Sequence, residues 1–212
     1  MKRIAAASLI VLSTLAGQAF AQQPERGWYA GISAGQSSAD VDSNALPVIG
    51  ATASTVTVED TDTAFKVYGG YRFGRHFAVE AGYADLGTFG ATRNVTSPGI
   101  GSVKAETSVS GIFGQAVGIL PLGERFTLFG TAGLFANEVK TTLSSTGAVV
   151  LVGQRSESNS DVNVKLGVGA GFDFTPKFGV RVEWERFFEL GDETVGGKSD
   201  VDLLSIGIVF RF

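Results

Sequence analysis

From Asp161 to Phe174 the sequence DVNVKLGVGAGFDF alternates without a break between large apolar residues and residues that are small or charged. Successive side chains of a β-strand point to opposite faces of a sheet, so this pattern predicts a strand with one wholly apolar face. The opposite face carries three glycines together with Asn163, Lys165 and Asp173. The two faces of this strand therefore need different surroundings, and this requirement constrains the fold more than any other feature of the sequence.

Seven further segments show the same alternation, and no convincing helical period lies between them. In chain order the eight predicted strands are 27–37, 63–73, 76–86, about 106–120, 126–139, 161–174, 178–190 and 200–212. Each is long enough to cross a membrane as a tilted strand, which takes roughly 9–11 residues. The last strand, with the sequence LLSIGIVFRF near its end, keeps its alternation up to an aromatic residue.

The small residues indicate which face points outward. A soluble barrel such as a lipocalin places large apolar side chains inside, but here the polar series contains too much glycine to cover a surface in water. The narrow lumen of eight strands requires small residues that alternate with large ones. We therefore expect an all-β fold, an eight-stranded antiparallel transmembrane up-and-down β-barrel whose apolar face meets lipid.

The predicted connections alternate between short and long. GR, PLGER and TPK form tight turns, whereas about 38–62, 87–105, 140–160 and the shorter 191–199 read as polar loops. Short turns at one end and long loops at the other are typical of outer-membrane barrels, whose turns lie in the periplasm. Aromatic residues gather near the strand ends, where interfacial girdles belong.

The N-terminus matches a secretory signal peptide. Two cations at positions 2 and 3 precede an apolar stretch that ends near residue 16, and AFA at 19–21 is a cleavage site of the small-x-small type. The apolar stretch is too short for a membrane anchor. The predicted organisation is a signal peptide at 1–21 and one outer-membrane barrel domain at 22–212. The absence of cysteine excludes a disulfide scaffold, and a net charge of −4 with scattered cations disfavours nucleic acid as a partner.

The order and spacing of five stretches resemble the eight-stranded OmpA-like transmembrane domain: GWYAGISAG, FKVYGGYRFGRHFAVEAGYADLG, PLGERFTLFGTAGLF, LGVGAGFDFTPKFGVRVEWERF and LLSIGIVFRF. The resemblance implies a barrel in the outer membrane of a Gram-negative cell. The C-terminus also resembles the signal that the outer-membrane assembly machinery recognises, a role that would fall on Phe212, Phe210 and Ile208. Because the chain stops at the eighth strand, without the peptidoglycan-binding domain of OmpA itself, we expect no tether to the cell wall.

The alternation assigns four cations and four anions to the lumen. They are Lys66, Arg72, Lys165, Arg181, Glu80, Asp173, Glu183 and Glu185. Balanced charges in a narrow, poorly hydrated space are expected to pair, because an unpaired buried ion costs several kcal/mol. Glu80 and Arg181 lie at similar distances in sequence from their turns and are expected to meet.

In the OmpA-like family a charged cluster blocks the lumen. The resemblance assigns Glu80, Arg181, Glu183 and Asp173 to that cluster. The family's lysine on the fourth strand has no counterpart here, because GQAVGIL offers Gln115 or Val117 and the facing of that strand is ambiguous. The alternatives for its role are Lys66, Arg72 and Lys165.

The sequence offers no catalytic site. Some eight-stranded barrels modify lipid A with a histidine and a serine or acid near the outer leaflet, but His76 lies beside a short turn on the predicted periplasmic side. Its position favours a turn residue over a general base. With one histidine and no cysteine we expect no metal, and no glycine-rich stretch precedes a helix as a phosphate-binding loop would, so we expect no cofactor.

The sequence thus predicts a barrel that contributes to outer-membrane integrity, with at most a narrow pore. Eight strands leave an interior just filled by side chains, whereas open porins have about 16–18 strands. Two alternatives stay open, namely an adhesin or host-interaction barrel acting through its long loops, and a small diffusion pore. The expected partners are outer-membrane lipid, lipopolysaccharide and, during insertion, the outer-membrane assembly machinery, and the barrel is expected to be a monomer.

Overall fold

The computed structural model describes residues 26–39, 53–97, 101–147, 156–192 and 197–212. These residues form the strands β1 (Gly27–Ala39), β2 (Ala53–Glu59), β3 (Thr61–Arg72), β4 (Phe77–Ser97), β5 (Gly101–Leu122), β6 (Phe126–Gly147), β7 (Ser156–Asp173), β8 (Phe178–Asp192) and β9 (Gly197–Arg211). Among them, no helix is long and apolar enough to cross a membrane. The predicted signal peptide at 1–21 lies outside the described residues.

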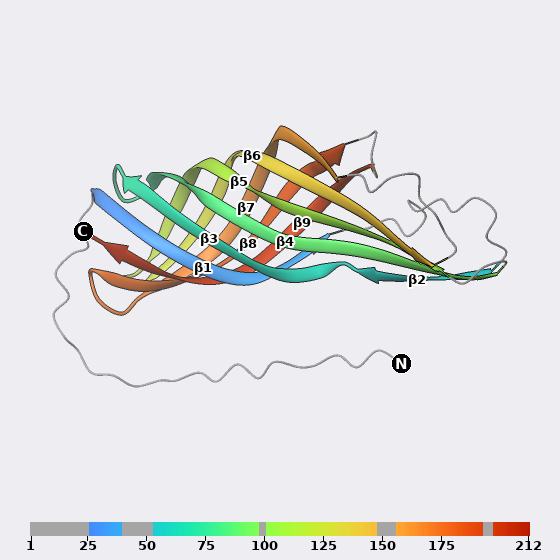
Figure 1. Cartoon of the computed structure of the whole chain (residues 1–212). Coiled ribbons are helices and arrows are strands. Elements are labelled where there is room, and N and C mark those ends of the chain that lie inside the picture. The colour runs from blue at the N-terminus through green and yellow to red at the C-terminus, as the bar shows by residue number, and fades with distance from the viewer. Residues whose placement is uncertain (1–25, 40–52, 98–100, 148–155, 193–196) are drawn as a thin grey trace.

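Eight of the strands close a ring of antiparallel ladders (Figure 1). The ring runs β1–β3–β4–β5–β6–β7–β8–β9 and returns to β1, where Tyr29 pairs with Arg211 and Ala39 with Val201. A closed ring leaves no row of unpaired backbone groups, and hydrocarbon tolerates none because it has no water to bind them. The predicted eight-stranded antiparallel barrel is therefore confirmed, with β2 as an additional strand outside the ring.

The two faces of the ring lie as the alternation predicts. On β7 the apolar residues from Val162 to Val168 are 46–60% exposed, whereas Asn163 and Lys165 are buried. On β9, Leu204, which begins the apolar series of the last strand, is 58% exposed. Local strand geometry alone fixes this outcome, because a strand that keeps its period of two cannot turn part of a series to the other face.

Short turns join the strands at one end of the ring, which we call the turn end. They occupy 73–76, 123–125 and 174–177. Both chain ends of the ring lie here too, since the Phe212 N–H donates to the Trp28 carbonyl at 3.1 Å. We call the opposite end the loop end.

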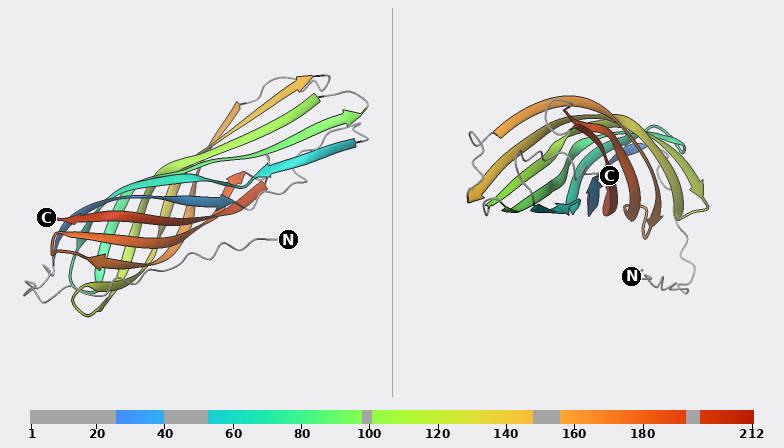
Figure 2. Two further views of the ribbon diagram at one scale, coloured as in Figure 1. Left: turned by 90° about the horizontal axis from the view of Figure 1, so that it is seen from below. Right: turned by 90° about the vertical axis from the view of Figure 1, so that its right-hand side faces the viewer.

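The connections at the loop end differ from the prediction. Several stretches expected to be loop are strand, the longest being 53–59, 87–97, 101–105, 140–147 and 156–160. The β5–β6 ladder continues from Leu122 paired with Phe126 to Gly101 paired with Gly147, and β2 pairs with the outer part of β4. These stretches form a sheet that extends past β1, β8 and β9 (Figure 2). We call this part of β2 and β4–β7 the projecting sheet.

Composition explains why the loop prediction was wrong there. Stretches such as ASTVTVE and ATRNVTS are polar, but they are rich in threonine and valine, which favour strands. A strand outside the membrane needs no apolar face, so its polarity does not distinguish it from a loop. A polar stretch becomes a strand when it forms a hydrogen-bonded ladder with a neighbouring strand, and the sequence does not show that ladder.

Small residues on the inner face make room for rings from neighbouring strands. A Cβ at Gly31 would overlap the ring of Tyr68, and a Cβ at Gly70 would overlap the ring of Tyr29. In the β1–β3 ladder Gly31 pairs directly with Tyr68, and Gly70 pairs directly with Tyr29. The inner glycines thus allow a narrow barrel to hold large side chains.

Candidate functional site: the charged interior

β8 places charged side chains at successive depths of the lumen. From the turn end toward the loop end its inward residues are Arg181, Glu183, Glu185 and Phe187. The three charged residues are at most 8% exposed. Because every second residue of a strand shares one face, this single element supplies a cation, two anions and a ring to the interior.

Arg181 is held between two carboxylates. Its Nη1 lies 2.6 Å from Oε1 of Glu80 on β4, and its Nη2 lies 3.0 Å from Oε1 of Glu183. Glu80 also accepts hydrogen bonds from the Tyr29 hydroxyl at 2.8 Å and from the Gln115 amide at 2.6 Å. Partners from three other strands, β1, β5 and β8, thus replace the water that this carboxylate loses on burial.

More charged side chains lie in the lumen on the side of the loop end. The Lys66 ammonium on β3 lies 2.6 Å from Oε2 of Glu183 and also contacts Glu185. Lys165 on β7 binds the other oxygen of Glu185. Glu183 joins the two groups, because one of its oxygens binds Arg181 and the other binds Lys66.

The result is one continuous chain of ion pairs that contains as many cations as anions. We call it the interior network, and its members are Glu80, Arg181, Glu183, Lys66, Glu185 and Lys165. Ring faces cover part of its positive charge, with Arg181 Cζ 4.3 Å from the centre of Phe129 and Lys165 Nζ 4.1 Å from that of Phe113. Rings in these positions attract a cation without supplying a mobile counter-charge.

The structure places two predicted members apart from this network. Asp173 lies nearer the turns, with its Oδ1 2.6 Å from Nη1 of Arg211. Arg72 donates to the carbonyls of Gly74 and Arg75, each at 3.0 Å. The other six predicted lumen charges come together. What role these eight residues have stays a prediction.

The structure also resolves the facing of the strand that was ambiguous in sequence. Gln115 and Val117 both point inward and are each 3% exposed, and Gln115 is the one that reaches Glu80. The sequence reasoning missed Tyr29 and Arg211 as interior partners. Arg211 could have been found from the sequence, because it belongs to the inward series of its strand. The contact of Tyr29 with Glu80 could not, because it depends on where two separate strands lie.

Toward the loop end the lumen becomes apolar. The rings of Phe135 and Phe187 meet edge to face with centres 4.9 Å apart, and both side chains are fully buried. Leu86, Leu203 and Phe113 are buried in the same hydrophobic cluster, and the ring of Phe113 also lies against the Lys165 ammonium. We call these five residues the apolar plug. An ion among these five side chains would lose water, and the five side chains themselves offer no polar replacement.

At the turn end the interior opens into a small cavity. Its volume is about 60 Å³, and its lining includes Tyr29, Arg72, Glu80, Arg181 and Arg211. A space of this size holds a few water molecules. Among the described residues, no group of three or more histidine, cysteine or acidic side chains could hold a metal ion.

A model of the outer membrane protein beta-barrel domain matches residues 7–212. The chain belongs to this family. Family membership places the protein in the bacterial outer membrane, in agreement with a ring that turns its apolar side chains outward. No protein of curated function matches this outer-membrane barrel in sequence.

Several solved structures are similar to this barrel. Neisserial surface protein A is 12% identical, with a TM-score of 0.52 over 88% of this chain and 97% of that one. Ail, the attachment invasion locus protein of Yersinia pestis in complex with the heparin analogue sucrose octasulfate, is 16% identical, with a TM-score of 0.48 over 88% and 99%. OprG from Pseudomonas aeruginosa is 16% identical, with a TM-score of 0.44 over 91% and 99%. At such identities the similarity concerns the fold alone.

The predicted assembly signal lies on the outer face of the barrel at the turn end. Phe212 is 70% exposed, Phe210 45% and Ile208 44%, and the two phenylalanine rings have centres 5.2 Å apart. Their role in assembly stays a prediction.

Proposed function

We propose that this outer-membrane barrel serves the integrity of the outer membrane as a closed structural barrel, with at most a narrow pore. Its partners in this role are outer-membrane lipid and lipopolysaccharide, with the assembly machinery acting during insertion. The proposal includes no catalytic step. His76, the one histidine, lies in the turn at 73–76 with its Nδ1 3.2 Å from the Ile119 carbonyl.

One observation carries the proposal: the lumen has two different barriers in series. The interior network fills the middle of the barrel with paired charges, and the apolar plug follows toward the loop end. An ion that displaced one salt bridge would still meet the apolar plug. Hydrophobic constrictions of this kind stop conduction by excluding water.

Single-channel recording in a planar lipid bilayer tests the proposal. The refolded protein is compared with Arg181→Ala, with Phe113→Ala/Phe187→Ala and with the combination of all three changes. We expect silent bilayers for the first three forms and current only for the combined variant, because only that form weakens both barriers. Lys140→Ala, on the projecting sheet, serves as a cation control outside the lumen.

A gel-mobility shift on boiling verifies that each form is folded before it is recorded. Discrete openings in the unchanged protein that alter with Arg181→Ala would show an ion path through the charged lumen, and would favour the diffusion pore over the structural role.

The projecting sheet favours a second candidate, an adhesin or host-interaction barrel. Its outer segments bear many serine and threonine side chains. The pairing of β7 with β8 begins only at Lys165, so 156–164 has no described partner strand on that side. An open strand edge is a surface to which an extended peptide adds by backbone hydrogen bonds.

Shortening the projecting sheet distinguishes the two candidates. A variant in which the projecting parts of the β4–β5 pair and of the β6–β7 pair, together with β2, are trimmed back to the ring should keep the closed barrel. If the protein is an adhesin, this variant loses the binding to host cells that the full chain confers on a non-adherent bacterium. Binding by neither form would leave only the structural role.

A further inference from the structure

Each short turn at the turn end places a cation between two exposed apolar side chains. The first has Arg75 between Phe73 and Phe77, and the third has Lys177 between Phe174 and Phe178. In the second, Arg125 follows Leu122 and precedes Phe126. Near the start of β1, Arg26 precedes the exposed Trp28 by two residues. We call Arg26, Arg75, Arg125 and Lys177 the cationic collar.

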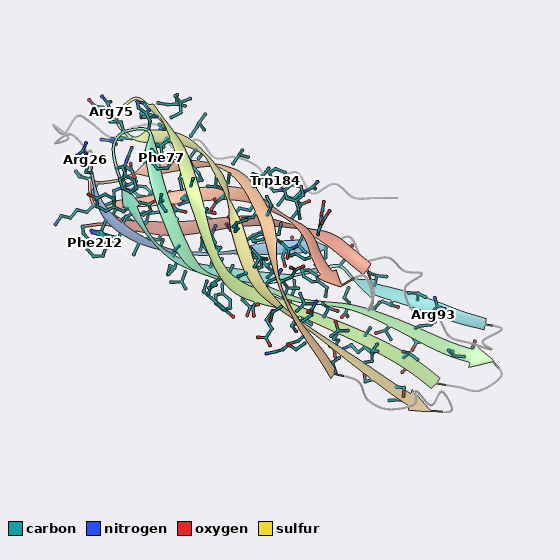
Figure 3. The ribbon with its side chains drawn as sticks, turned by 90° about the horizontal axis from the view of Figure 1, so that it is seen from above. Arg26, Arg75, Phe77, Arg93, Trp184 and Phe212 are labelled. Atoms are coloured by element: carbon teal, nitrogen blue, oxygen red, sulfur yellow. The ribbon has the colours of Figure 1, made fainter. Side chains whose placement is uncertain are left out.

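The side chains around the cationic collar point away from the barrel. Figure 3 shows Arg26, Arg75, Phe77 and Phe212 gathered at the turn end, far from Arg93 on the projecting sheet. Phe77 is 47% exposed and Phe212 70% exposed. These rings continue the lipid-facing surface, so the cations stand where that surface ends.

Backbone hydrogen bonds fix each turn to a neighbouring strand. The Ile119 N–H donates to the carbonyl of His76 at 2.8 Å, and the Asp173 N–H donates to that of Arg125 at 2.9 Å. The Arg211 N–H donates to the carbonyl of Lys177 at 2.8 Å. The cations are therefore spaced around a rigid rim.

Charge at the turn end is mainly positive. Within the described part of the chain, the acidic side chains there are Glu124 and Asp173, and Asp173 already binds Arg211. Among the described residues, Arg26, Arg75 and Lys177 form no ion pair.

At the loop end acids outnumber cations. The acidic residues there include Glu59, Asp60, Asp62, Asp85, Glu106, Glu138, Asp161, Glu189, Asp200 and Asp202. Two of the cations at that end, Lys104 and Lys140, are paired with Glu106 and Glu138. The excess of unpaired positive charge therefore belongs to the turn end.

We propose that the cationic collar binds the phosphates of anionic phospholipid in the leaflet that surrounds the turn end. Exposed aromatic rings settle at the boundary between acyl chains and headgroups. Arginine and lysine beside them extend their charged ends into the headgroup layer. A headgroup that carries a net negative charge fits this layer, whereas a zwitterionic one offsets its phosphate with its own cation.

The inference goes beyond a closed structural barrel and is independent of it, because it uses only the outer surface. A conducting lumen would contradict the closed barrel but not the lipid binding. The absence of a lipid preference would contradict the lipid binding but not the closed barrel.

The two tryptophans allow a sharp test, because they lie in different parts of the barrel. Trp28 adjoins the cationic collar, whereas Trp184 lies on the outer face of β8, away from it (Figure 3). Trp184→Phe therefore leaves a reporter at the collar, and Trp28→Phe leaves one away from it. Each form is refolded into vesicles that mix phosphatidylglycerol with phosphatidylcholine, one of the two carrying brominated acyl chains that quench tryptophan.

We expect phosphatidylglycerol to be preferred over phosphatidylcholine at Trp28 by about five-fold. This is the preference that the attraction of one lysine or arginine to an anionic surface produces. The preference should fall toward one in Arg26→Gln/Arg75→Gln/Lys177→Gln and in high salt. At Trp184 the two lipids should quench equally. The matched control is Arg93→Gln/Lys104→Gln/Lys140→Gln, which removes three cations from the projecting sheet and should leave the preference at Trp28 unchanged.

Equal quenching by the two lipids at Trp28 would overturn the inference. So would an equal loss of preference in the control triple, because it would trace the effect to net charge and not to the cationic collar. The heat-dependent gel shift shows beforehand that every form is folded.

Discussion

Arg181 shows how a charge is tolerated inside this barrel. It is 8% exposed, pairs with Glu80 and Glu183, and lies over the ring of Phe129. Two anions share one cation here, and Lys66 supplies the second positive charge for Glu183. The balance is therefore a property of the whole interior network, and removing one member leaves a buried charge without compensation.

Arg181→Met is expected to lower the free energy of unfolding by about 3–5 kcal/mol, because Glu80 and Glu183 lose their shared cation while both stay buried. Urea unfolding of the refolded barrel in lipid vesicles measures the change. The control is Lys140→Met, which breaks an exposed pair with Glu138 and should leave the free energy of unfolding nearly unchanged.

Arg181→Met combined with Glu80→Gln should recover part of the lost free energy of unfolding, since it removes one of the buried charges that Arg181→Met leaves without a partner. Equal effects of Arg181→Met and Lys140→Met would contradict the view that the interior network is tightly coupled.

At the scale of single strands, β5 and β6 use glycine for two different purposes. A Cβ at Gly133, on the inner face of β6, would overlap the carbonyl oxygen of Gly114 and the backbone of Gln115. A Cβ at Gly114, on the outer face of β5, would meet no atom within 4 Å. Only the inner glycine is required by packing. The outer one weakens its strand through the extra freedom of the unfolded chain.

Gly114→Ala is therefore expected to raise the free energy of unfolding by about 0.5–1 kcal/mol. Gly133→Ala should lower it by about 1–3 kcal/mol, because the new methyl group has to displace backbone. The same urea titration measures both. Destabilisation of similar size by the two substitutions would show that strand position, and not inner space, governs these glycines.

At the scale of the whole molecule, closure of the ring explains why the last strand is needed in full. β9 pairs with β8 on one side and with β1 on the other, from Val201 to Arg211. Without β9, both neighbours would present open backbone groups to hydrocarbon. No part of the ring can therefore open without breaking a ladder.

The folded protein is accordingly expected to resist SDS at room temperature and to migrate differently after boiling. Gel electrophoresis of boiled and unboiled samples measures this. A chain that lacks residues 197–212 is the control and should show a single mobility, because its ring does not close. Identical migration of the boiled and unboiled full-length protein would count against a closed ring in solution.

Much of the fold could be read from the sequence because it depends on neighbours along the chain. The faces of β7 and β9 follow from a period of two, and the inward position of Glu80, Arg181 and Glu183 follows from the same rule. The short turns were also predicted, since a glycine or proline between two alternating segments marks them locally.

Contacts between distant strands were decided by the tertiary structure. Lys66 reaches Glu183 and Glu185 across 117 and 119 residues, and Gln115 reaches Glu80 across 35. These pairings depend on the tilt and register of the ring, which no single segment encodes. The projecting sheet was missed for the same reason, because a polar stretch becomes strand only when another strand lies beside it. The sequence by itself determined which side chains enter the lumen, whereas the closed barrel determined which of them meet.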